Sequence, residues 1–72
     1  MWHSFMQLTV NIGKGEQADL AERISTITPV LDAERIGNGQ CVFTLQSGTK
    51  GTLVSVETLL AEAGVTFEKT QN

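Results

Sequence analysis

The sequence predicts a small two-layer α+β sandwich, in which helices cover one side of an antiparallel sheet. Segments with the apolar period of strands alternate with segments of helical period, and each has one apolar face to bury. Their order along the chain is β-α-β-β-α-β. With right-handed crossovers in the two β-α-β units, this order gives the ferredoxin-like plait, with both helices on one face of the sheet.

The first strand and helix are predicted by a change of period near residue 13. Residues 5–12 alternate, with one apolar face formed by Met6, Leu8, Val10 and Ile12. A turn at Gly13-Lys14-Gly15 leads into a helix at about 16–27, where Leu20, Ile24 and Ile27 recur at helical spacing. Pro29 closes this helix, because proline offers no amide and excludes the α region for the preceding residue.

A hairpin is expected next. Residues 30–36 are expected to form a second strand. Neither alternate set of its side chains is purely apolar, so its register stays open. An edge strand tolerates such a mixed pattern. The sequence Gly37-Asn38-Gly39 is typical of a hairpin turn, because both residue types accept positive φ. The third strand buries the alternate residues Cys41, Phe43 and Leu45.

A second helix is predicted after the loop 46–52. Its apolar stripe consists of Leu53, Val56, Leu60 and Ala63, with Leu59 beside them. Thr52 or Ser55 is expected as the N-cap, and Gly64 followed by Val65 as a left-handed C-cap. The alternative is that the β-branched stretch 52–56 pairs back on the third strand as a hairpin. A short last strand is predicted over residues 65–68.

Composition limits the classes of function. The 72 residues, 40% hydrophobic and 18% charged, indicate one soluble globular domain over 1–72. Neither a stretch of about 20 apolar residues nor a signal-peptide pattern is visible, so a cytoplasmic protein is expected. The formal charge is −3, and the five basic residues are spread along the chain, which disfavours nucleic acid as a partner. They are Lys14, Arg23, Arg35, Lys50 and Lys69.

The β-α-β-β-α-β layout over nearly the whole chain resembles the topology of three families: amino-acid-sensing ACT domains, heavy-metal-associated chaperone domains and RNA-binding RRM domains. The heavy-metal family carries Met-x-Cys-x-x-Cys where this chain has residues 13–17 without cysteine, so its thiolate metal site is not implied. RRM domains need aromatic residues on the open sheet face, and here that face offers Thr9, Asn11, Val42 and Thr44. A glycine at the first strand-to-helix turn is compatible with ACT-like ligand sensing.

The two glycine- and lysine-bearing loops are the main candidate site. The first and third strands are expected to run parallel as neighbours, which brings both strand-to-helix loops to one rim of the sheet. Each loop precedes a helix N-terminus, whose amides favour anions, so a phosphate or carboxylate ligand is one hypothesis and ordinary solvated turns are the other. The candidate residues are Gly13, Lys14, Gly15, Ser47, Gly48, Lys50, Gly51 and Thr52.

Three further features of the sequence are candidates for a functional or structural role. The free amine of Met1 and the imidazole of His3 form a weak candidate site for Cu(II) or Ni(II); no other metal site and no cofactor is expected. Trp2 and Phe5 either cap the core or form part of an interaction surface. Cys41 is expected as a small core residue and not as a nucleophile.

No catalytic constellation is visible in the sequence, so a protein without enzymatic activity is predicted. The expected function is a small acidic cytoplasmic module for protein interaction or regulation, whose partner is another protein or a second copy bound through the open sheet face or an edge strand. The alternative is a sensor of a small anion or amino acid, using the two loops. A minor third hypothesis is an enzyme that uses one of the scattered carboxylates.

Overall fold

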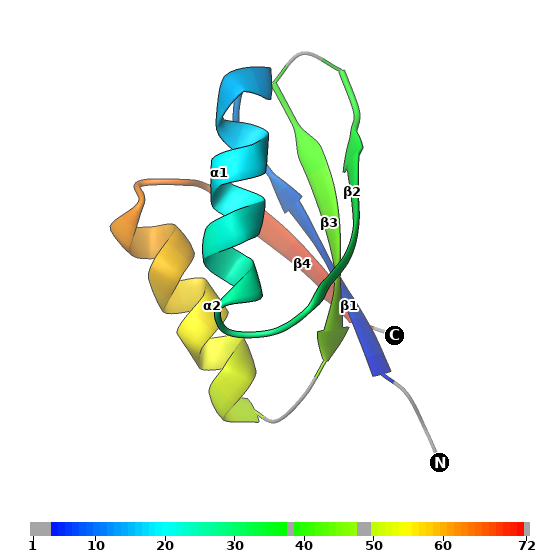
Figure 1. Ribbon diagram of the computed structural model, residues 1–72, viewed down its shortest axis with the longest axis vertical. Helices are drawn as coiled ribbons and strands as arrows, with labels where there is room; N and C mark the ends of the chain where they lie inside the picture. The colour runs from blue at the N-terminus through cyan, green and yellow to red at the C-terminus, as the bar shows by residue number, and fades with distance from the viewer. Residues whose placement is uncertain (1–3, 38, 48–49, 72) are drawn as a thin grey trace.

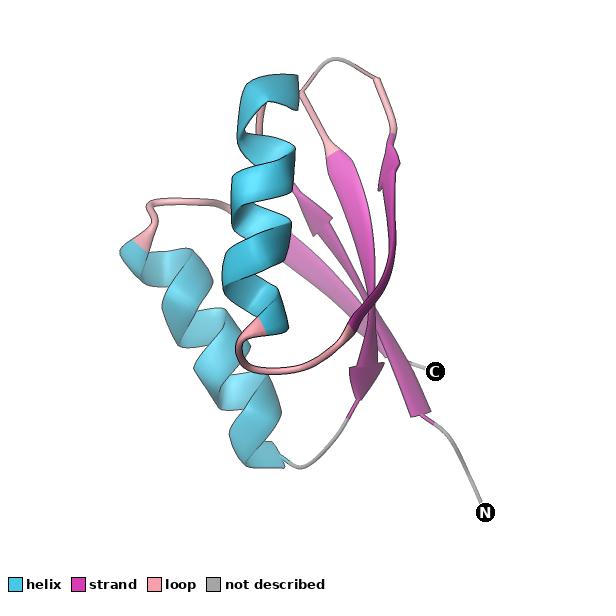
Figure 2. Cartoon of the chain, viewed as in Figure 1, coloured by secondary structure: helices cyan, strands magenta, loops and turns pink. Residues whose placement is uncertain are grey.

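A computed structural model of the protein describes residues 4–37, 39–47 and 50–71 and has the predicted element order. A four-stranded antiparallel sheet in the order β2-β3-β1-β4 is covered on one side by α1 and α2 (Figures 1 and 2), so the fold is a ferredoxin-like α+β sandwich. The elements are β1 (Ser4–Val10), α1 (Lys14–Ser25), β2 (Val30–Arg35), β3 (Cys41–Ser47), α2 (Lys50–Glu62) and β4 (Phe67–Gln71). None of the described helices is long and apolar enough to cross a bilayer.

The central strands β1 and β3 run antiparallel, so the prediction that they run parallel is wrong. Ser4 lies opposite Ser47 and Val10 lies opposite Cys41. The reason is topological. The crossover through α1 makes β1 parallel to β2, and β3, which follows β2 through a hairpin, lies between them and runs the other way.

The core lies between the sheet and the two helices, and its residues are largely those that the apolar periods predicted. Alternate residues of β1 and β3 point towards buried residues of both helices, with Leu8 directly opposite Phe43. The buried apolar residues are Met6, Leu8, Val10, Ile12, Leu20, Ile24, Cys41, Phe43, Leu45, Val56 and Leu60.

A bulge explains the mixed pattern of β2. Val30 lies opposite Leu45 and Ala33 lies opposite Phe43, with a shift of register between Val30 and Asp32. Both Val30 and Ala33 therefore face the helices, although they are an odd number of residues apart, and Leu31 remains 49% exposed. Simple alternation cannot describe a strand with one extra residue.

The helix starts differ from the predicted ones. Helix α1 begins at Lys14 with Gly13 as N-cap and ends at Ser25, before Pro29 is reached. Residues 52–56 are helical, which excludes the hairpin alternative for this stretch. Because α2 begins at Lys50, Thr52 and Ser55 lie inside it, and the prediction that one of them is the N-cap is wrong.

The end of α2 confirms the predicted left-handed cap. Gly64 has φ +73°, and the amides of Gly64 and Val65 donate to the carbonyls of Ala61 (3.1 Å) and Leu60 (3.0 Å). The amide of Val65 is used in this cap, and β4 begins two residues later than predicted, at Phe67. In the β2–β3 turn, Gly37 has the expected positive φ of +75°, while Asn38 lies outside the described residues.

Candidate functional site

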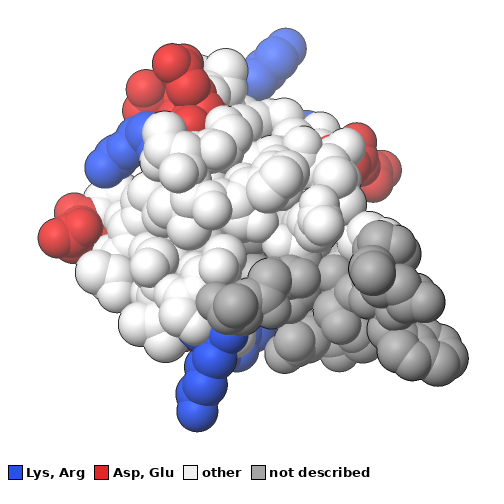
Figure 3. Space-filling view, turned by 60° about the horizontal axis from the view of Figure 1, so that its bottom comes forward, with Lys and Arg blue, Asp and Glu red and all other residues white. Residues whose placement is uncertain are grey.

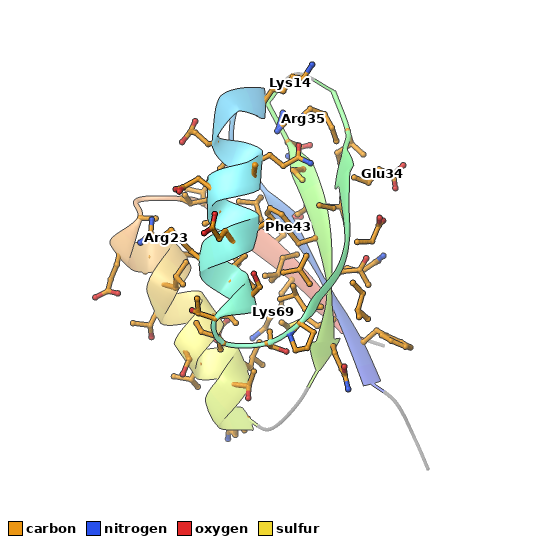
Figure 4. The ribbon with its side chains drawn as sticks, in the orientation of Figure 1. Lys14, Arg23, Glu34, Arg35, Phe43 and Lys69 are labelled. Atoms are coloured by element: carbon orange, nitrogen blue, oxygen red, sulfur yellow. The ribbon has the colours of Figure 1, made fainter. Side chains whose placement is uncertain are left out.

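The two loops of the predicted anion site lie at opposite ends of the molecule. Figure 4 shows Lys14 at the upper end, and Figure 1 shows α2 starting at the lower end. Antiparallel pairing of β1 and β3 requires this separation, because each loop follows the C-terminal end of its strand. Gly13, Lys14 and Gly15 are therefore not brought together with Lys50, Gly51 and Thr52; Gly48 and the side chain of Ser47 lie outside the described residues.

The N-terminus of α1 already holds an internal anion. The carboxylate Oε1 of Glu16 accepts a hydrogen bond from the amide of Gly13 at 3.3 Å. Glu16 is the third residue of the helix, and its charge complements the helix dipole there. A phosphate bound at the amide of Gly13 has to displace this carboxylate.

A groove lies instead between α1 and β2. It has a volume of about 310 Å³ and is lined mainly by small side chains: Ala18 and Ala21 of α1 and Ala33 of β2, with Lys14 and Gln17 completing it. The α1 residues recur at helical spacing, so they form one stripe beside the buried stripe of Leu20 and Ile24. The groove therefore lies beside the core, between α1 and the edge strand β2.

The strand that forms one wall of this groove, β2, is an edge strand of the described sheet. Its last residue, Arg35, points towards α1 (Figure 4), where Nε donates to Oε1 of Gln17 at 3.0 Å. The guanidinium also donates to the carbonyl of Ile12, from Nη2 at 2.9 Å and from Nη1 at 3.2 Å. Arg35 thus ties the edge strand to α1 and to the loop before it.

Among the described residues, the fold places acidic but no basic side chains on the sheet face away from the helices. On the sheet face away from the helices, Asp32 and Glu34 lie opposite Thr44 and Val42, and Glu68 lies on β4 opposite Thr9. Glu34 is seen in Figure 4 pointing away from the helices. This open face is defined by the side chains of Phe5, Gln7, Thr9, Asp32, Glu34, Val42, Thr44, Gln46 and Glu68.

All five basic residues lie elsewhere. Three of them, Lys14, Arg23 and Lys50, are on the helices, and Arg35 and Lys69 are on the helix-facing side of the edge strands. The other five acids lie on α1 and α2 and equal the five bases of the whole chain in number, so the three acids of the open face account for the formal charge of −3. In Figure 3, Lys and Arg side chains are likewise separated around a broad uncharged area and do not gather.

The other candidate residues from the sequence do not form a common site among the described residues. Phe5 is 41% exposed on the open face, whereas Met1, Trp2 and His3 lie outside the described residues. Cys41 is fully buried, and burial raises the pKa of its thiol, with nearby Arg35 acting in the opposite direction. Over the described parts of the chain, no three His, Cys, Asp or Glu side chains come together as metal ligands.

Sequence reasoning missed the groove, although two signals were present. One is the pair of alanines on α1, Ala18 and Ala21, beside the buried stripe. The other is the mixed pattern of β2, in which Asp32 and Glu34 flank Ala33. No protein-family model matches the chain, and neither a curated protein nor a solved structure matches it significantly.

Proposed function

We propose that this protein is a non-enzymatic interaction module. It binds an extended segment of a partner protein, which lies along the edge strand β2. The observation that carries the proposal is the groove of about 310 Å³ between α1 and the edge strand β2. A strand that adds to a sheet edge gains affinity from main-chain hydrogen bonds and specificity from pockets for alternate side chains. The β2 edge offers both features together.

The geometry of strand addition supports this use of the groove. Ala33 faces the helices, and a residue directly opposite it on an added strand faces the same way. The side chain of that residue enters the space beside Ala18 and Ala21. Because alanine side chains are short, they leave room there for a larger apolar side chain from the partner.

The other edge of the sheet is less suited to a partner strand. On β4, Lys69 lies on the helix-facing side opposite Leu8, and its Nζ is 3.0 Å from Oε2 of Glu57 on α2. Inward-pointing charges on edge strands discourage the addition of further strands. Strand β2 also carries one, Arg35, but it is the last residue of its strand and is hydrogen-bonded to α1 and to the loop before it, whereas Lys69 lies in the middle of β4. The proposal therefore assigns the partner to β2.

The first experiment selects binders from a displayed library of random ten-residue peptides and titrates a selected peptide into the ¹⁵N-labelled protein. Amide shifts are expected at Ala33 and Ala18, on the two walls of the groove. Ala18→Leu fills the groove and is expected to weaken binding about tenfold or more, because one apolar side chain of the peptide loses its burial.

The matched control is Ala61→Leu, the same substitution at an exposed position of α2 away from the groove. It is expected to leave the affinity unchanged, and thermal melts of both variants check that each is folded. The proposal is wrong if no selected peptide shifts the β2 amides, or if Ala61→Leu weakens binding as much as Ala18→Leu.

A further inference from the structure

We infer that the partner segment carries basic side chains at two alternate positions that flank an apolar one. This inference rests on the proposed function and adds the chemistry of the partner. Asp32 and Glu34 are both exposed and are two residues apart on the open-face side of β2, with Ala33 between them on the groove side. On an added strand, the residues opposite the two acids face the open side, and the residue between them enters the groove.

The charge of the surroundings favours bases at those two positions. No described basic residue lies on the open face, so the field of Asp32 and Glu34 is not neutralised by a neighbour there. Opposite charges directly across a strand pair stabilise it, and like charges destabilise it. A segment of the pattern base, apolar residue, base therefore complements both sides of β2 at once.

On the groove side of β2, basic side chains of the partner segment are disfavoured. Arg35 and Lys14 both lie on the helix side, at the end of β2 and at the start of α1 (Figure 4). A base on that side of the partner segment meets like charge. The preference for bases is thus confined to the open-face positions, which makes it a preference for an alternating pattern and not for general positive charge.

The same acids disfavour a second copy of this chain as the partner through β2. A two-fold pairing of β2 with β2 keeps open-face residues opposite open-face residues. Centred on Ala33, it places Asp32 of each copy against Glu34 of the other; centred on Asp32 or Glu34, it places that acid against itself. Each of these three registers therefore opposes like charges, while the bulge at Leu31 further limits pairing of the edge.

The test uses three ten-residue peptides that share leucine at the groove-side position and threonine at the ends. They differ only in the two flanking residues, which are lysine, glutamine or glutamate. The lysine peptide is expected to bind most tightly and the glutamate peptide least tightly, with about a two- to five-fold change for each charge pair. Raising the salt concentration is expected to reduce the difference.

Substitutions in the protein test whether Asp32 and Glu34 cause the preference for the lysine peptide. Asp32→Asn combined with Glu34→Gln is expected to remove the advantage of the lysine peptide over the glutamine peptide. Glu68→Gln is the matched control, because Glu68 lies on the same open face but at the opposite edge of the sheet. It is expected to leave that advantage nearly unchanged.

The possible results separate the inference from the proposed function. If the lysine and glutamine peptides shift the β2 amides with equal affinity, the inference is wrong and the proposed function stands. If none of the three peptides shifts the β2 amides while a peptide selected from the library does, the inference is wrong and the proposed function stands; if no selected peptide shifts them either, both are wrong. If Glu68→Gln removes the advantage as fully as the double variant, the attraction is not local to β2, and the inference is again wrong.

Discussion

Replacing Gly64 with alanine is expected to destabilise the protein, whereas the same replacement at Gly15 is expected to stabilise it. Gly64 ends α2 with φ +73°, in the left-handed region, while Gly15 lies inside α1. An added Cβ meets nothing within 4 Å at either position. The two substitutions therefore differ in backbone conformation and not in packing.

The magnitudes follow from that difference. A left-handed residue with a side chain costs about 1–2 kcal/mol, and the smaller entropy of the unfolded alanine chain offsets about 0.4–1 kcal/mol of it. Gly64→Ala should thus lower the free energy of unfolding by about 1 kcal/mol. Gly15→Ala should raise it by up to about 1 kcal/mol, because alanine is the better helix former.

Urea denaturation followed by circular dichroism measures both changes, and thermal melts should separate the variants by roughly 4–8 °C for each kcal/mol. Gly64→Asn is a graded control, because asparagine tolerates the left-handed region better than alanine does. If Gly64→Ala were as stable as the parent, or Gly15→Ala less stable than Gly64→Ala, the assignment of these effects to backbone conformation would be refuted.

Three further predictions concern the core, the thiol and the loops. Phe43→Ala is expected to lower the unfolding free energy by about 3–5 kcal/mol in urea titrations, since Phe43 is fully buried; a loss below about 1 kcal/mol would contradict its central place. The raised pKa of Cys41 means that the native state holds the thiol proton more tightly than the unfolded chain. Its contribution to stability should therefore be lost as pH rises from the ordinary value of 9.0 through the native pKa, a slope that Cys41→Ala should lack. Titration with millimolar phosphate should not shift the amides of Gly15 and Gly51 together; a joint saturable shift would contradict the separation of the two loops.

In the proposed function, the β2 edge combines protection against self-association with binding of a partner. A bulge and two exposed acids are features that keep natural sheet edges from pairing with one another. They act against a second copy because it carries the same acids. In the proposed function, a segment of opposite charge meets attraction at the same positions, so the two acids that limit self-association also select the partner.

Much of the fold could be predicted from the sequence, because burial has a local period. Met6, Leu8 and Val10 alternate, Leu20 and Ile24 recur at helical spacing, and all five are buried. The type and order of the elements follow from such patterns. The candidate site could not be predicted in the same way, because its parts come from separate elements.

The sequence alone determined the order of helices and strands and, β2 excepted, the faces that they bury, since these depend on neighbours a few residues apart. The tertiary structure decided three other features: the antiparallel direction of β1 and β3, the groove between Ala18 and Ala33, and the gathering of negative charge on the open face. Each of these depends on which distant segments become neighbours and in which register. The period of a single segment carries no information about that choice.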